Sequence, residues 1–156
     1  MTDRQIIVWK LIEKFQKDEP RIVLYKHEKN MGLVTTRAHL GQYAKGMYLM
    51  WLDPDDAYCS PDAAKMTYEK AEISGADIIH FKNLMVEPNG IQNGRSPKIS
   101  GIMKQPQLSD AIFNKKKNLA VNTVAMWNKL YTKTNYLAAI SFLGEKRYKE
   151  HFLTDT

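Results

Sequence analysis

Three carboxylates stand within four positions, at Asp53, Asp55 and Asp56, directly after the uncharged run 47–52. A short apolar run of this kind is typical of a strand that is buried on both faces of a sheet. In open α/β sheets, ligands bind at the carboxyl ends of the strands, where these side chains would then lie. Carboxylates this close repel one another unless a cation joins them, and a hard divalent cation with phosphate oxygens as its other ligands meets that need. The alternative is that Asp55 or Asp56 caps a following helix or is simply solvated.

Length and composition limit the classes of protein to which this chain can belong. The 156 residues suffice for one domain with a proper core but not for two ordinary ones. No run approaches the roughly 20 apolar residues that span a bilayer, and residues 1–4 lack the apolar core of a signal peptide. The one cysteine, Cys59, excludes an internal disulfide framework and suits a reducing compartment. We therefore expect a cytoplasmic protein with at most peripheral membrane contact.

The net charge of +6 and pI of about 9.3 indicate a basic surface. Such a surface attracts nucleic acid, anionic lipid or phosphorylated ligands without distinguishing them. The basic residues are dispersed among acidic ones except at Lys115–Lys117, a cluster that we interpret as a solvated turn. No RNA-recognition signature is present, so nucleic acid is not an expected partner. No Cys/His cluster has the spacing of a zinc site either.

Hydrophobic periodicity predicts alternating helices and strands. The predicted helices cover 4–18, 32–44 and 61–74, and the predicted strands cover 21–26, 47–52 and 77–86. This alternation favours an α/β fold with a mainly parallel sheet and flanking helices, in which 47–52 is the central strand and pairs in parallel with 21–26 and 77–82. Residues 87–106 hold three of the six prolines and are predicted to form a loop or irregular hairpin within a single domain, 1–156. Residues 107–118 and 119–140 are predicted to be helical or mixed.

Further residues extend the acidic motif in both directions along the chain. They are Asn30, Gly32, Leu33 and Arg37, then Gly46, Tyr48, Leu52, Asp53, Asp55 and Asp56, and later Trp127-Asn128-Lys129-Leu130-Tyr131. In this order and spacing they resemble the motifs of the inverting family-2 glycosyltransferases, including the DxD motif. The resemblance covers roughly residues 3 to 156. It implies the GT-A fold, the Rossmann-like fold of nucleotide-diphospho-sugar transferases.

The resemblance also implies a function, which is metal-assisted transfer of a sugar, of the hexosyltransferase type, with inversion. The donor would be a nucleotide-sugar, with UDP-sugars favoured, and the acceptor a hydroxyl of an unidentified glycan, lipid or protein. Mn²⁺ or Mg²⁺ would offset charge on the leaving diphosphate. Asp55 is the expected main metal ligand, Asp53 contacts the metal or its water shell or the ribose, and Asp56 orients the acceptor or a ligand water.

Three further residues are expected to bind the donor. The guanidinium of Arg37 suits phosphate, although a structural ion pair with one of the aspartates is equally compatible with its chemistry. Trp127 could stack on a sugar and Lys129 could meet a phosphate, and the alternative for both is ordinary packing of an amphipathic segment.

The expected catalytic base departs from the family's pattern. The family uses the Asp of a Glu-Asp pair near the end of the domain, and the matching residues here are Glu150 and His151. A histidine can accept a proton near neutral pH, so His151 is the candidate base and Glu150 its neighbour. A surface histidine without a chemical role is the simpler reading of His151.

The resemblance further implies that the front of the domain is missing. Family members begin with two strands that hold the nucleotide base, and Thr2-Asp3 align with the end of the acidic turn after the second one. An N-terminally truncated domain would expose a sheet edge and favour homo-oligomers. The alternative function is therefore a non-catalytic or fragmentary glycosyltransferase-like binding or interaction module.

Overall fold

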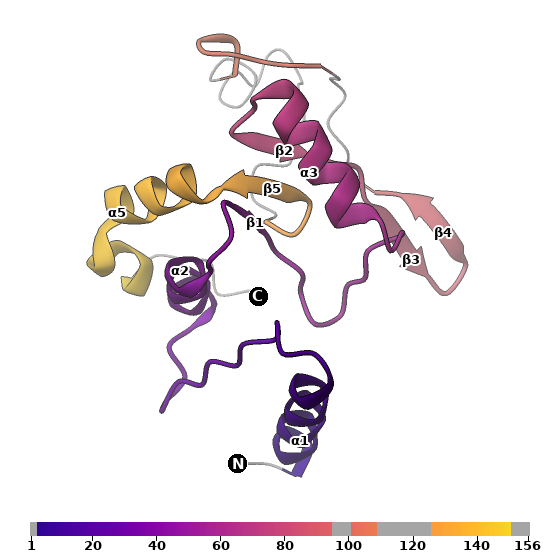
Figure 1. The fold of residues 1–156 in the computed structure, drawn as a ribbon, viewed down its shortest axis with the longest axis vertical. Helices are drawn as coiled ribbons and strands as arrows, with labels where there is room; N and C mark the ends of the chain where they lie inside the picture. Colours follow the sequence, from indigo (N-terminus) through magenta and orange to yellow (C-terminus); the bar gives the residue numbers. More distant parts are fainter. Residues whose placement is uncertain (1–2, 95–100, 109–125, 151–156) are drawn as a thin grey trace.

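The computed structural model describes residues 3–94, 101–108 and 126–150 (Figure 1). Its helices are α1 (Asp3–Asp18), α2 (Leu33–Tyr43), α3 (Ala63–Ser74) and α5 (Lys133–Glu150). Its strands are β1 (Tyr48–Met50), β2 (Ile78–His80), β3 (Leu84–Glu87), β4 (Gly90–Asn93) and β5 (Lys129–Thr132). The three helices predicted from periodicity are confirmed, with ends that differ by no more than two residues.

The main sheet has the strand order β1-β5-β2, and both outer strands are antiparallel to β5. Leu130 of β5 lies between Met50 of β1 and Ile79 of β2. The mainly parallel sheet predicted from the sequence is therefore wrong for these strands, and so is the central position of 47–52. The predicted strands at 47–52 and 77–82 do run in the same direction, but β5 separates them. It joins the sheet from a distant part of the chain, which local periodicity cannot show.

Residues 21–26 were predicted to form a strand but adopt no regular structure. Two residues of their apolar run, Val23 and Tyr25, do not face a core, because they are 57% and 42% exposed. Tyr25 instead stacks on Tyr43 of α2, with ring centroids 4.3 Å apart. An apolar run identifies a segment that is able to form a strand, whereas the strand itself requires a hydrogen-bonded neighbour.

Helices cover the two faces of the main sheet. On one face, Tyr48 donates a hydrogen bond to Glu72 of α3 (2.7 Å) and packs edge-on against Tyr68. The side chains of neighbouring strand residues point to opposite faces, so Tyr131 and Leu49 face the other way, toward α2 and α5. Figure 1 shows α3 beside β2, with α2 and α5 together on the other side.

A close approach of α2 and α5 fixes the second layer. Tyr136 of α5 is 6% exposed and donates a hydrogen bond to the Arg37 carbonyl of α2 (3.1 Å). Its ring lies over Gly41, where an added Cβ would come within 2.3 Å of a ring carbon. A glycine is therefore needed here for packing, and the contact holds the α2 backbone around Arg37 against α5.

The helix α1 lies apart from the sheet (Figure 1). Its apolar residues Ile7, Val8, Leu11 and Phe15 are each at least half exposed. It contacts the following segment through the Lys26 ammonium, which lies 5.2 Å from the Trp9 ring centroid. Strands β3 and β4 form a separate antiparallel hairpin. In the part of the chain that the structure describes, no helix is long and apolar enough to cross a membrane.

Candidate functional site

The three carboxylates lie on a tight turn that follows β1. The Asp56 amide donates a hydrogen bond to the Asp53 carbonyl (3.1 Å), and Pro54 occupies the second position of this turn. The Asp53 side chain is half-buried, whereas Asp55 and Asp56 are exposed. Slight desolvation in the turn raises the pKa of Asp56 above its ordinary value, and the charges of Asp55 and Asp53 add to this effect. The turn thus gathers negative charge, as a cation site requires.

Arg37 and Asp53 form an ion pair that connects α2 to this turn. Their side chains are 15% and 30% exposed, so water screens the pair less than it would a surface pair. Of the two roles expected for Arg37, the structure therefore contains the ion pair with an aspartate. Within the described ranges, neither Asp55 nor Asp56 forms an ion pair.

The acidic turn does not make a closed metal cage. Among the residues that the structure describes, no three His, Cys, Asp or Glu side chains gather closely enough to hold a metal ion. One or two carboxylates are nevertheless the usual protein contribution to a magnesium site that is completed by water and substrate phosphates. The exposed oxygens of Asp55 and Asp56 fit that arrangement, with Asp53 held beside them by Arg37.

A buried polar cluster lies where β5 begins. Asn128 is fully buried and Lys129 is 5% exposed. The Lys129 ammonium donates to Asn128 Oδ1 (2.8 Å), and Asn128 Nδ2 lies 2.8 Å from His80 Nε2 of β2. Burial lowers the pKa of Lys129 to about 8, and burial together with the charge of Lys129 lowers that of His80 to about 4. The predicted donor-binding residue Lys129 is therefore an internally held ammonium.

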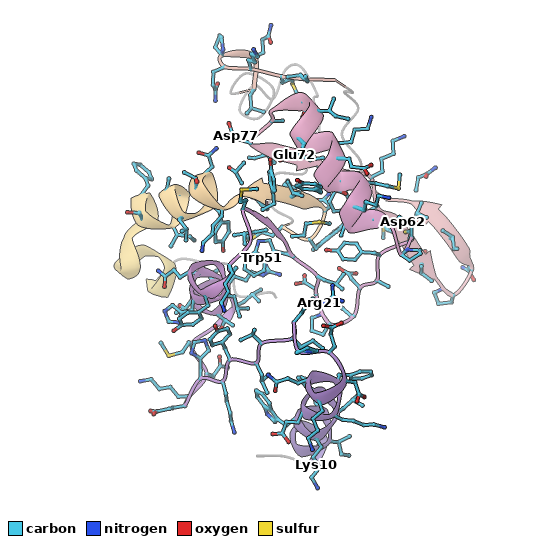
Figure 2. The ribbon with its side chains drawn as sticks, in the orientation of Figure 1. Lys10, Arg21, Trp51, Asp62, Glu72 and Asp77 are labelled. Carbon is cyan, nitrogen blue, oxygen red and sulfur yellow. The ribbon has the colours of Figure 1, made fainter. Side chains whose placement is uncertain are left out.

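An aromatic cluster lies between the sheet and the α2–α5 layer. Trp51 and Tyr131 both contact Tyr136, with ring centroids 5.4 and 5.9 Å apart. Burial raises the pKa of Tyr131 and of Tyr136 to about 12, against the opposing effect of the Arg37 charge. Figure 2 shows Trp51 between α2 and the end of β1. Its buried indole nitrogen has no hydrogen-bond partner in the described part of the chain.

The remaining predicted site residues are less well placed. Trp127 is half-buried immediately before β5, and its stacking on a sugar stays a prediction. Glu150 is the last residue of α5, which kinks at Gly144 (φ 67°), and His151 lies outside the described residues. The prediction of a base at this position is therefore untested.

Sequence reasoning missed His80 and the role of Asn128 beside it. Asn128 belongs to the Trp-Asn-Lys-Leu-Tyr motif, and His80 ends an apolar strand, where a titratable side chain stands out. Their contact spans 48 positions in the chain, so only the fold brings them together.

Comparison with known proteins identifies the class to which this fold and site belong. The model of the glycosyl transferase family 2 matches residues 7–143, so the chain belongs to this family. A processive diacylglycerol beta-glycosyltransferase from Mycoplasma pneumoniae is 29% identical over 79 residues, which are 49% of this chain and 23% of that protein. No solved structure matches. The predicted family is confirmed, and the chain matches less than a quarter of its curated relative.

Proposed function

We propose that this chain is a glycosyltransferase domain whose acidic turn binds the diphosphate of a nucleotide-sugar through Mn²⁺ or Mg²⁺. The observation that carries the proposal is the placement of Asp55 and Asp56. Both are exposed and lie on a turn that is anchored by the Arg37–Asp53 ion pair. An anchored turn presents its free carboxylates in one arrangement, and binding then orders fewer groups.

Each residue of the turn has a distinct part. Asp55 is the proposed metal ligand, Asp56 orients a ligand water or the acceptor, and Asp53 holds the turn through Arg37 while its second oxygen faces the donor. A bound divalent cation would stabilise the negative charge that develops on the leaving diphosphate. Lys129, at the start of β5, supplies a second positive charge for the phosphates. The resemblance to family-2 glycosyltransferases favours UDP-sugars as the donors.

We propose a lipid hydroxyl as the acceptor. The relative from Mycoplasma pneumoniae is named for glycosylation of diacylglycerol. The net charge of +6 would also attract the chain to an anionic membrane surface, where such an acceptor resides. Inversion at the sugar requires a base that takes the proton of this hydroxyl, and His151 with Glu150 remains the candidate.

The alternative is a non-catalytic binding module with the same scaffold. The observation that favours it is His151, which stands where the resemblance predicts an aspartate. The two functions share donor binding and differ in turnover.

Calorimetry of UDP with the protein in Mn²⁺ tests donor binding. We expect Asp55→Asn to weaken binding and Asp62→Asn, a change at an exposed carboxylate ahead of α3, to leave it unchanged. Transfer of labelled sugar from UDP-sugars to vesicles that contain diacylglycerol then separates enzyme from binding module. We expect little turnover from this chain, because His151 stands where the resemblance predicts the aspartate that takes the acceptor's proton. No UDP binding in wild type would contradict both functions.

A further inference from the structure

The polar cluster at the start of β5 has a fixed hydrogen-bond direction. An ammonium has only donors, so the Lys129 Nζ contact at 2.8 Å requires that the oxygen of the Asn128 amide faces it. The amide nitrogen then faces His80 Nε2 at 2.8 Å. Because that nitrogen donates, His80 Nε2 must accept. The imidazole is therefore neutral and carries its proton on Nδ1.

The burial of the cluster makes this order costly to break. Asn128 is fully buried and Lys129 is 5% exposed. A proton on His80 Nε2 would place two donors against each other at the fully buried Asn128 amide, beside the charge of Lys129. The lowered pKa of His80, about 4, agrees with this arrangement.

The cluster lies at the end of the sheet that carries the acidic turn. Leu130 pairs with Met50, so Lys129, one residue earlier, extends toward Trp51 and the turn beyond it. His80 pairs with Lys129 at the carboxyl end of β2. The backbone of Lys129 thus lies at the same end of the sheet as the acidic turn.

We propose that Asn128 is a positioning residue that holds the Lys129 ammonium toward the donor diphosphate, with the proton-free His80 Nε2 as the acceptor that locks the Asn128 amide. The choice of a diphosphate as the anion rests on the proposed function. The order of hydrogen bonds from Lys129 through Asn128 to His80 is independent of that function.

The first test is the tautomer of His80, measured by long-range ¹H–¹⁵N NMR on the protein without ligand. We expect the Nδ1–H form at pH 7 in wild type. In Asn128→Asp, a carboxylate oxygen would face Nε2, so we expect a proton on Nε2 and a higher pKa for His80. An Nε2–H tautomer in wild type, or a histidine spectrum unaltered by Asn128→Asp, would overturn the proposal. The wild-type measurement decides even if the variant does not fold.

The second test is the affinity for UDP in Mn²⁺, with UMP as the control ligand. We expect Asn128→Leu and Lys129→Met each to weaken UDP binding about tenfold, the double variant to add little, and UMP to lose less. Additive losses, or equal losses for UMP, would show that Asn128 does not act through Lys129 on the diphosphate. If wild type binds no UDP but His80 has the expected tautomer, the proposed function fails while the hydrogen-bond order stands.

Discussion

The Arg37 guanidinium binds the Asp53 carboxylate and so joins α2 to the acidic turn after β1. Tyr136 of α5 holds the same stretch of α2 through a hydrogen bond to the Arg37 carbonyl. The α2–α5 contact and the acidic turn are therefore connected through one residue. Arg37 neutralises one of three neighbouring carboxylates, and in the described part of the chain the other two, Asp55 and Asp56, form no ion pair.

Arg37→Gln is expected to destabilise the fold by about 1–3 kcal/mol, because it leaves the partly buried Asp53 charge unpaired. The matched control is Arg21→Gln, which breaks the exposed pair with Glu19 and is expected to cost much less, because water screens that pair. Urea unfolding of both variants measures the difference. Adding Asp53→Asn should recover part of the loss, and strictly additive effects would argue against the pair.

Gly41→Ala is expected to cost about 1–3 kcal/mol of stability, despite the better helix propensity of alanine. The new methyl would lie 2.3 Å from the Tyr136 ring, which is buried and also contacts Trp51 and Tyr131. Gln42→Ala, at the next and exposed position, is the control and should be nearly neutral. A thermal midpoint for Gly41→Ala at or above that of wild type would contradict this contact.

Stability should fall between pH 6.5 and 4 because of His80. Its pKa is lowered to about 4 from 6.5, so across this range the unfolded chain binds a proton that the folded protein excludes. The unfolded state is thus favoured as pH falls, by about 1–2 kcal/mol, because His80 is only half-buried and water screens part of the effect. His80→Gln keeps an acceptor for Asn128 but does not titrate. Urea midpoints measured across this range should depend less on pH in His80→Gln, and parallel curves would disprove the assignment.

The exposed apolar side of α1 is expected to promote self-association. Leu11 and Phe15 are 51% and 56% exposed, and in the described part of the chain β1 pairs only with β5, which leaves its other edge open. Sedimentation velocity should show concentration-dependent association that Leu11→Lys with Phe15→Lys reduces. Glu13→Lys, an equally exposed charge change on the same helix, is the control. A wild-type monomer at all concentrations would contradict the prediction.

The features that could be predicted from the sequence are those that depend on residues close together in the chain. The end of α3 at Gly75 follows from one residue that readily adopts a left-handed conformation (φ 61°). The sheet was predicted wrongly because its central strand, β5, lies far along the chain from β1, and apolar runs do not specify their partners. At the site, charge alone indicated both alternatives for Arg37, and the structure contains the ion pair with Asp53. The contact of His80 with Asn128 required the register of β2 on β5.

The central claim is that the acidic turn binds a metal–diphosphate, and Mn²⁺ binding measured by water-proton relaxation tests it most directly. We expect weak binding by the protein alone and tighter binding with UDP, because phosphate oxygens complete the coordination. Asp55→Asn should weaken the binding about tenfold or more, since it removes a charged oxygen ligand and keeps the shape of the side chain. Asp62→Asn should bind as wild type does. Equal Mn²⁺ affinity in wild type and Asp55→Asn, with and without UDP, would contradict the account.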